Sequence, residues 1–222
     1  KAASAVITAS YGPVVQNVTV TVADGRFWYS LGNGLGNGLD NNWYLDGNNA
    51  SVVSSDGNKT TVQMGSGYRG DLWLARSGKG KIVNVTPADY RYFAIKVGFK
   101  SQLVPGKNKP NGCIKLEIFD DGIKKIGPEY FGTGGDANNR YEILGASEIS
   151  TTEPNVLYYD LQSKYKTVTP TDWNQVFDLS QCKFVIADFP ETAQTYDLYW
   201  IRSFKSIEEL QAFVDSENNT NE

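Results

Sequence analysis

The sequence predicts an all-β protein: a two-sheet antiparallel β-sandwich of the jelly-roll type, with one short C-terminal α-helix. Three observations carry this prediction. Apolar residues recur at every second position in short runs, clusters of Gly, Asn and Asp separate these runs, and a helical period appears only near the C-terminal end. The 222 residues are 40% hydrophobic and include 22 Gly, 13 Tyr, 10 Phe and 5 Trp, which suits a β-sheet core.

Strict alternation defines each predicted strand. Along 92–99 it turns every second residue, beginning with Phe93, toward the core, and along 27–31 it leaves Trp28 on the opposite face. Turn clusters such as 33–38 separate the strands. The predicted strands are 18–22, 27–31, 60–64, 71–75, 92–99, 114–118, 156–161, 184–188 and 196–204.

One helix is predicted after the last strand. Ser206 and Glu209 have the spacing of a capping box, in which each side chain accepts a backbone N–H at the start of the helix. The apolar stripe that should pack on the sandwich consists of Ile207, Leu210, Phe213 and Val214. We expect residues 25–215 to form the sandwich domain, 1–24 a leading strand or the tail of a preceding domain, and 216–222 a disordered tail.

Composition excludes several classes of function. The 21 Lys and Arg residues are spread along the chain against 25 Asp and Glu, so the basic patch of a nucleic-acid-binding protein is missing. The absence of His rules out His-containing triads and His-metal sites. No apolar run approaches the ~20 residues of a membrane span, so no membrane-spanning helix is predicted. For Cys113 and Cys182, buried free thiols are favoured over a disulfide.

The most attractive ligand-binding residue is Trp73. If Leu72 and Leu74 face the core, Arg69, Asp71 and Trp73 share the opposite face of one strand. An aromatic ring can stack on the apolar face of a sugar while neighbouring charged groups hydrogen-bond the hydroxyls. The alternative is that another part of the fold covers this face.

Other aromatic residues are candidates for the same role. Trp43 lies in a polar loop rich in Asn and Asp, and Trp28 lies off the core face of its strand. Trp173 precedes a strand, and Tyr130 heads a Gly-rich loop. Packing of each ring onto the sandwich is the alternative. Trp200 is instead expected in the core or beneath the helix, because it shares the parity of inward-facing neighbours.

Oxygen-rich side chains in one loop could hold a structural calcium ion, because hard cations prefer carboxylate and amide oxygens. The candidate ligands are Asp40, Asn42, Asp46 and Asn48. Their spacing lacks the closing Glu of an EF-hand, and Asx turns explain the same residues without a metal. No cofactor is otherwise required.

Carboxylates do not cluster in a way that indicates an enzyme. A glycoside hydrolase needs two of them facing each other across a cleft, and no strand-borne cluster suggests such a pair. Asp160, Asp188 and Asp197 lie within or at the ends of strands. We expect them to cap turns or to pair with Lys96 or Arg202, and we expect no enzymatic activity.

Several segments resemble a family of uncharacterised β-sandwich domains in surface lipoproteins of gut bacteria, encoded within polysaccharide utilisation systems. The segments are 93–97, 156–161, 184–188 and 196–210, and the resemblance covers roughly 25–215. The run Tyr-Trp-Ile-Arg-Ser-Phe-Lys-Ser-Ile-Glu-Glu-Leu, at 199–210, is its most specific part.

The resemblance implies a jelly-roll fold similar to carbohydrate-binding modules and the binding of polysaccharides or oligosaccharides at the bacterial cell surface. Together with the lack of clustered carboxylates, it predicts a non-catalytic role. The resemblance also implies an outer-membrane lipoprotein whose export signal is not present in this chain, with membrane contact only through a lipid anchor outside this chain and with other surface glycan-uptake proteins as partners. A structural spacer or adhesion module without its own ligand is the alternative. A glycoside hydrolase is a more distant one.

Overall fold

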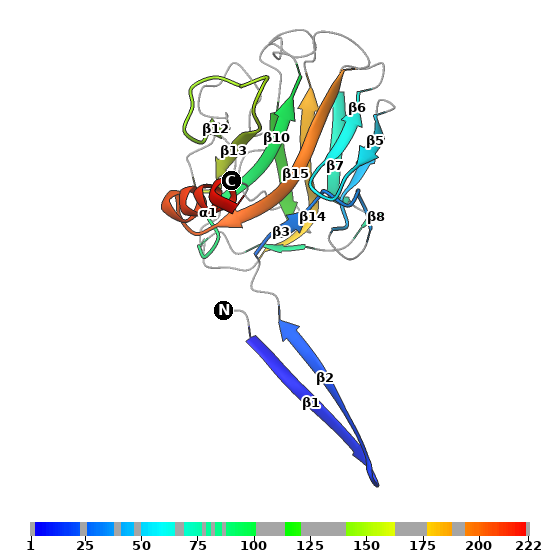
Figure 1. Ribbon diagram of the computed structural model, residues 1–222. Coiled ribbons are helices and arrows are strands. Elements are labelled where there is room, and N and C mark those ends of the chain that lie inside the picture. Colours follow the sequence, from blue (N-terminus) through cyan, green and yellow to red (C-terminus); the bar gives the residue numbers. More distant parts are fainter. Residues whose placement is uncertain are drawn as a thin grey trace.

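Two antiparallel sheets pack face to face in the computed structural model, and one helix lies against the outer side of the larger sheet (Figure 1). This arrangement confirms the predicted all-β sandwich with a C-terminal helix. The structure describes residues 3–22, 26–37, 41–46, 50–64, 69–76, 79–80, 83–85, 88–100, 114–120, 141–162, 177–187 and 194–220.

Hydrogen bonding defines the two sheets. The strands of the larger sheet are β3 (Trp28–Ser30), β5 (Ser51–Ser55), β6 (Thr60–Gln63), β10 (Tyr92–Phe99), β12 (Glu142–Ile143), β13 (Asn155–Asp160) and β15 (Thr195–Phe204). Their order is β12-β13-β10-β15-β6-β5, with β3 also paired to β15. The strands of the smaller sheet are β4 (Tyr44–Asp46), β7 (Arg69–Arg76), β8 (Lys79–Gly80), β9 (Val83–Val85), β11 (Ile114–Asp120) and β14 (Phe177–Ala187). Their order is β11-β14-β7-β4, with β8 paired to β7 and β9 to β14.

The chain passes back and forth between the two sheets. From β6 onward the longer strands alternate, with β6, β10, β13 and β15 in the larger sheet and β7, β11 and β14 in the smaller one. A jelly roll is wound in this way, so that successive strands lie on opposite sides of one core. Every predicted strand recurs, and several are longer than the alternation alone indicated.

The core lies between the inner faces of the two sheets. Phe93, Ile95 and Val97 of β10 are fully buried there, as predicted, together with Leu72 and Phe184 of the smaller sheet. Complete burial of such a side chain stabilises the fold by about 1.5–3 kcal/mol. Because packing occupies the inner faces, ligand chemistry on the larger sheet is confined to its outer face.

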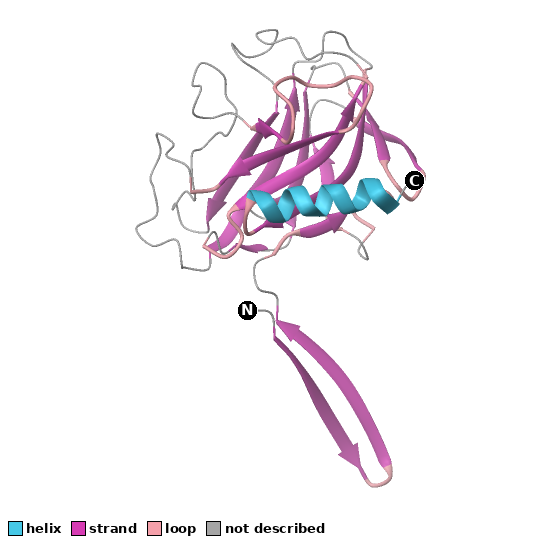
Figure 2. Cartoon of the chain, turned by 60° about the vertical axis from the view of Figure 1, so that its left-hand side comes forward, coloured by secondary structure: helices cyan, strands magenta, loops and turns pink. Residues whose placement is uncertain are grey.

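Helix α1 (Ile207–Thr220) covers part of that outer face (Figure 2). The predicted capping box forms in part, with Glu209 reaching the residue before the N-cap rather than the N-cap itself. The Glu209 N–H donates to Ser206 Oγ at 3.2 Å, and the Lys205 N–H donates to Glu209 Oε2 at 2.7 Å. Leu210 is fully buried, which confirms that the apolar stripe packs on the sandwich.

The helix is longer than predicted, because Glu217 fastens its last turns to the sheet. Trp200 Nε1–H donates to Glu217 Oε2 at 3.0 Å, and the Lys96 ammonium nitrogen lies 3.1 Å from the same oxygen. The expectation that 216–222 is disordered is therefore wrong for residues 216–220, which are helical. Residues 221–222 lie outside the described part of the chain.

Residues 3–22 form a two-stranded sheet of their own, in which β1 (Ala3–Tyr11) pairs antiparallel with β2 (Val14–Val22). This hairpin projects from the sandwich in both views (Figures 1 and 2) and pairs with neither of the other sheets. Tyr11, near its tip, is 89% exposed. The assignment of 1–24 to a leading strand or a preceding domain stays a prediction.

Candidate ligand-binding cleft

Trp73 does not present an open ring. Leu72 and Leu74 are buried in the core as predicted, but Trp73 is itself only 7% exposed. Lys183 of the adjacent β14 pairs with it in register, and the Lys183 ammonium nitrogen lies 4.4 Å from the ring centroid. The prediction that Trp73 is a sugar-stacking platform is wrong, because its surroundings, including the side chain from the next strand, cover the ring.

Trp43 is a core residue. Its side chain is fully buried, with the ring centroids of Tyr29 and Phe184 at 5.9 and 5.8 Å. Asn41 folds the loop inward, since its Oδ1 accepts hydrogen bonds from the backbone N–H groups of Gly36 and Trp43 at 3.0 and 3.1 Å. The prediction of an exposed loop platform at Trp43 is therefore wrong.

Trp28 lies off the core face, as predicted, and is 42% exposed. The guanidinium carbons of Arg26 and Arg202 lie 3.8 and 4.4 Å from its ring centroid. Cations over a ring compete with a sugar for its faces. A role for Trp28 in binding stays a prediction, whereas Trp200 is 3% exposed and lies beneath the helix, as expected.

Other predicted site residues lie outside the described part of the chain. Tyr130, Trp173, Asp40 and Asn48 do so entirely, and for Arg69, Asp71 and Asp46 only the backbone is described. Asn42, the remaining calcium candidate, is partly buried. Within the described residues no group of three or more His, Cys, Asp or Glu side chains could hold a metal ion, and the calcium site stays a prediction.

Two further predictions concern the cysteine thiols and membrane-spanning helices. Cys182 is fully buried and free, as predicted, and burial raises the pKa of its thiol. Cys113 lies outside the described residues. Among the helices of the described chain, none has the length and apolar character needed to cross a bilayer.

Asp160 caps a turn, as predicted, whereas the ion pairs of Asp160 and Asp197 are formed with cations other than the predicted Lys96 and Arg202. Asp160 accepts two 2.6 Å hydrogen bonds from the Arg91 guanidinium and caps a turn, whereas Asp197 binds lysines described below. Lys96 and Arg202 pair with Glu217 of the helix instead. The sequence could not reveal this, because the register between β15 and α1 is set by tertiary packing. Residue 188 lies outside the described part.

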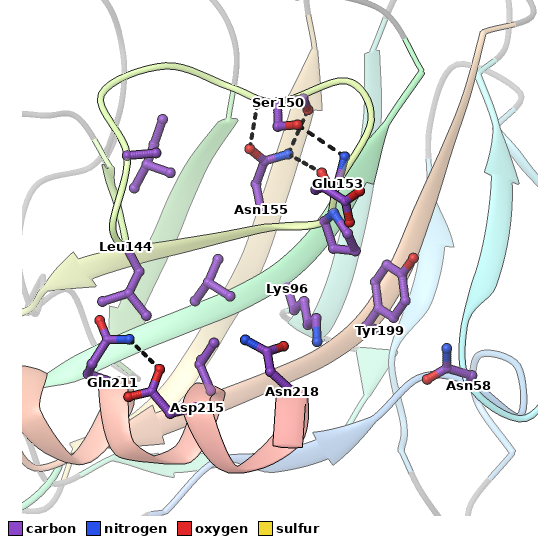
Figure 3. A pocket seen from close by; sticks show the side chains of 15 residues that line it. Asn58, Lys96, Leu144, Ser150, Glu153, Asn155, Tyr199, Gln211, Asp215 and Asn218 are labelled. Atoms are coloured by element: carbon purple, nitrogen blue, oxygen red, sulfur yellow. Dashed lines mark hydrogen bonds between the residues drawn. The ribbon is translucent and has the colours of Figure 1, made fainter. Parts of the chain in front are cut away.

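The described residues form an open cleft on the outer face of the larger sheet, beside α1 (Figure 3). Its volume is about 820 Å³. Strands β10 and β15 provide its floor, α1 one wall, and the segment 143–156 the other. Its charged and amide side chains include Asn58, Lys96, Glu153, Gln211, Asp215 and Asn218.

A β-bulge places the aromatic residue of the cleft floor. Lys96 of β10 pairs with Trp200, but the next residue, Val97, pairs with Leu198, so Tyr199 has no partner on β10, although its carbonyl oxygen accepts a hydrogen bond from the Leu31 N–H at 2.9 Å. Such an extra residue shifts the alternation of a strand. Tyr199 and Trp200 therefore both lie on the outer face, where Trp200 enters the helix interface and Tyr199 lines the cleft.

The helical wall is held in place by one carboxylate. Glu217 accepts from Trp200 and Lys96, and its Oε1 lies 3.6 Å from the Arg202 guanidinium. Along the exposed side of this helix, Gln211 Nε2 donates to Asp215 Oδ1 at 2.8 Å. The cleft thus receives amide and carboxylate groups from a helix whose C-terminal end is anchored.

Asn155 holds the opposite wall. This residue is 4% exposed, and its Oδ1 accepts a hydrogen bond from the Ser150 N–H at 2.8 Å. Its Nδ2 donates to the carbonyl oxygen of Ser150 at 2.9 Å. Both ends of the Asn155 amide are therefore used to shape the loop that brings Glu153 to the cleft (Figure 3).

The far end of the cleft is formed by the turn between β5 and β6. Asp56 Oδ1 accepts hydrogen bonds from the N–H groups of Asn58 and Lys59 at 2.9 and 2.8 Å. The turn packs tightly on Gly32, where any larger residue would collide with the carbonyl group of Gly57. Asn58 is thereby fixed beside the cleft.

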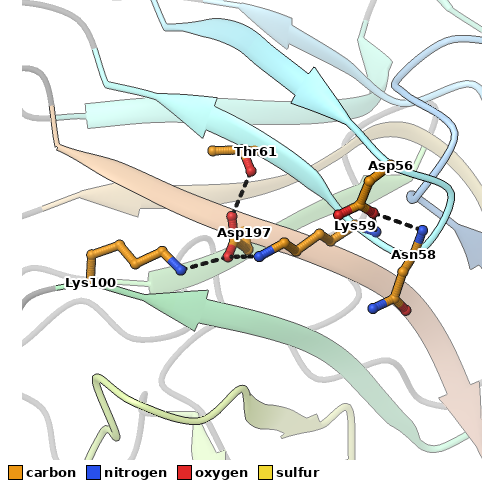
Figure 4. A network of polar contacts seen from close by, with 6 residues as sticks. All are labelled: Asp56, Asn58, Lys59, Thr61, Lys100 and Asp197. Carbon is orange, nitrogen blue, oxygen red and sulfur yellow. Dashed lines mark hydrogen bonds and ion pairs between the residues drawn. The ribbon is translucent and has the colours of Figure 1, made fainter. Parts of the chain in front are cut away.

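Beside this turn, Asp197 lies under two lysines (Figure 4). The ammonium nitrogens of Lys59 and Lys100 are each 2.8 Å from its Oδ2, and Thr61 Oγ1 donates to Oδ1 at 2.7 Å. Burial by itself would raise the pKa of Asp197, but these hydrogen bonds outweigh burial and hold the pKa below its usual value. Asp197 is therefore ionised at neutral pH.

This arrangement suits recognition of a polar ligand with an apolar face. Burial raises the pKa of Tyr199, so its hydroxyl stays protonated at neutral pH and can donate a hydrogen bond. The ring offers stacking, and the surrounding amides and charges offer hydrogen bonds. The cleft is not predicted from the sequence, because the bulge that puts Tyr199 and Trp200 on the same face leaves no mark in the alternation.

Comparison with known proteins identifies a family that the chain matches. The sequence profile of a family described as a domain of unknown function (DUF4979) matches residues 34–210. No curated protein and no solved structure matches the chain significantly. The match includes the cleft floor and the first turn of α1, and leaves out the N-terminal hairpin.

Proposed function

Because the chain belongs to the DUF4979 family of domains of unknown function, whose description assigns no activity, we propose from the cleft that this domain binds glycans without cleaving them. Oligosaccharides or segments of polysaccharides would lie along the outer face of the larger sheet. The single observation that supports this most is Tyr199 on the floor of an open cleft lined by amides, carboxylates and one ammonium group.

The chemistry of sugars fits such a lining. A pyranose has an apolar face of C–H groups that stacks on an aromatic ring, and hydroxyls around its rim that pair with amides and carboxylates. One stacked ring is worth about 1 kcal/mol beyond area burial, so binding should be weak, with Kd about 0.1–1 mM. The open shape of the cleft favours a ligand that binds along its surface over one that is fully enclosed.

Catalysis is not part of the proposal. Glu153 and Asp215 reach the cleft from opposite walls, and both are exposed. The acid of a glycoside hydrolase is kept protonated by apolar surroundings, which neither of these carboxylates has. Incubation of the protein with a polysaccharide panel should release no new reducing ends, and any cleavage by the protein alone would show an enzyme instead.

Affinity electrophoresis through gels containing neutral and acidic polysaccharides tests the binding. We expect at least one polysaccharide to retard the protein, and Tyr199→Ala to weaken this retardation about fivefold, since 1 kcal/mol is lost. Tyr11→Ala is a matched control, because Tyr11 is an 89% exposed tyrosine on the hairpin. Equal retardation of Tyr199→Ala and wild type would move the site elsewhere.

A spacer or adhesion module without a glycan ligand is the competing function. The separate hairpin at residues 3–22 favours it, because an element outside the sandwich can join this domain to another part of an assembly. Failure of every polysaccharide to retard the wild-type protein would support this function against glycan binding.

We also propose a place at the bacterial cell surface, attached through a lipid anchor outside this chain and working beside other glycan-uptake proteins. The support is the resemblance of residues 196–210 to domains of surface lipoproteins. Protease added to intact cells should remove the protein, whereas protection until the cells are lysed would overturn this location.

A further inference from the structure

The exposed charge next to Tyr199 is positive. The Asp197 side chain is only 2% exposed, whereas those of its partners Lys59 and Lys100 are 30% and 52% exposed. A molecule approaching from solvent therefore meets two ammonium groups, with the carboxylate that balances one of them beneath. Asp56 in the neighbouring turn is an exposed carboxylate too, hydrogen-bonded by two backbone N–H groups, so two exposed ammonium groups face one exposed carboxylate in this region.

A second cluster of similar composition lies on the other side of the ring. Lys96 and Arg202 share the carboxylate of Glu217, and the Lys96 ammonium nitrogen lies 5.5 Å from the Tyr199 ring centroid. Among the described side chains, each cluster therefore joins two cations to one carboxylate. Their fields add at Tyr199, which is the aromatic residue between them.

Gly98 lies between the Tyr199 ring and the carboxylate that holds the two lysines. A methyl group at this position would lie 3.6 Å from Tyr199 Cε2 and 3.7 Å from Asp197 Oδ2. The ring and the lysine-bearing carboxylate thus flank a single glycine of β10. A monosaccharide stacked on Tyr199 places its ring substituents within reach of the ammonium groups.

The acidic residues of the cleft lie toward the other side. Figure 3 shows Glu153 on the loop wall and Asp215 on the helix, both away from Asn58, which neighbours Lys59 in the chain. The ammonium groups of Lys59 and Lys100 lie beside the turn of Asn58 rather than in the lining of the cleft, so a pair of cations borders one end of the cleft and the acidic side chains line its walls. This polarity would orient a charged ligand with its anionic group toward the turn that carries Asn58 and Lys59.

We propose that the cleft selects acidic glycans, with a uronate carboxylate or a sulfate ester held by Lys59 and Lys100 while the sugar ring lies on Tyr199. The inference rests on the proposed glycan-binding function and names its ligand class. Ammonium groups form charge-assisted hydrogen bonds with such anions. A neutral glycan would leave both lysines without this interaction.

Isothermal titration of the 222-residue chain at low ionic strength tests the inference. The probes are polygalacturonate, for a carboxylate, and a sulfated galactan, for a sulfate, each beside its carboxyl-reduced or desulfated neutral form. We expect one acidic probe to bind more tightly than its neutral form, and the preference to shrink as salt rises. Lys100→Gln should weaken acidic binding about three- to fivefold, because an exposed ion pair is worth up to about 1 kcal/mol.

Lys205→Gln is the matched control, because it removes the same charge from an exposed lysine at the opposite end of α1. It should leave acidic binding unchanged, and thermal melting should show that both variants stay folded. Equal binding of acidic and neutral probes, or an unaltered Lys100→Gln variant, would overturn the acidic preference and leave glycan binding intact. Absence of binding to every probe, acidic or neutral, would defeat both proposals.

Discussion

The outer face of the larger sheet has two halves with different environments. Under α1, Ala94, Trp200 and Phe204 are buried against Leu210. Beyond the end of the helix, Tyr199 and Lys96 line an open cleft, and Asp197 with its two lysines lies beside it (Figures 3 and 4). Both halves come from the same two strands, β10 and β15, yet the helix covers one half and leaves the other exposed.

The difference arises between two adjacent residues. The bulge in β15 turns Tyr199 and Trp200 to the same face, and α1 ends over only one of them. Aromatic side chains therefore have two uses here. A covered ring contributes packing and a satisfied N–H to stability, whereas an uncovered ring keeps its face available to a ligand.

Trp200→Ala should cause the largest loss of stability, because it removes packing from the covered half. It removes a 3% exposed ring packed against Phe204 and Phe213, and the hydrogen bond to Glu217. We expect the free energy of unfolding to fall by about 3–5 kcal/mol in urea denaturation. A loss below about 1 kcal/mol would mean that the helix is not what seals this half.

Asp197→Asn should come next, at about 2 kcal/mol near pH 7, because two partly exposed lysines lose their shared carboxylate. The pKa of Asp197 is lowered in the folded protein, so its contribution is complete above the unfolded value of about 3.9. It is lost as the pH falls through the lower folded-state pKa. Urea melts from pH 3 to 8 should show the difference between wild type and variant shrinking only below about pH 4, and a constant difference would contradict this.

The sequence predicts the strands and the helix that follow a periodic pattern, but not the features that interrupt this pattern. The period of two located β10 and β15, and the capping box located the start of α1, because both are local patterns written in neighbouring residues. The burial of Trp43 and Trp73 depends instead on Asn41 and Lys183. Burial by residues from other segments has no local signature.

The candidate cleft was missed for the same reason. Its residues come from β10, β15, the β5–β6 turn, the loop before β13 and the outer side of α1. Tyr199 had the parity of an outward residue, but only the bulge explains why Trp200 accompanies it. The sequence predicts a disordered tail that includes Glu217, because nothing in the sequence of the helix indicates the distant partners of this residue.

Glu217→Gln should lower stability moderately and should loosen α1 only near its C-terminal end, where the covered half meets the open half. The amide keeps the shape but loses the ion pairs with Lys96 and Arg202, at a cost of about 1 kcal/mol. Hydrogen exchange should accelerate over residues 214–220 and stay unchanged at the capped start of α1. Asp215→Asn, an exposed neighbour on the same helix, is the control and should leave both ends as they are.

Tyr199→Ala should have the smallest effect on stability, although its neighbour has the largest. Its ring is partly exposed and contributes to the cleft rather than to the sealed interface, so we expect the free energy of unfolding to change by less than about 1 kcal/mol. The same urea melts used for Trp200→Ala provide the measurement. If both substitutions cost the same, the ring of Tyr199 is a packing element, and the open half of the sheet is not set apart for a ligand.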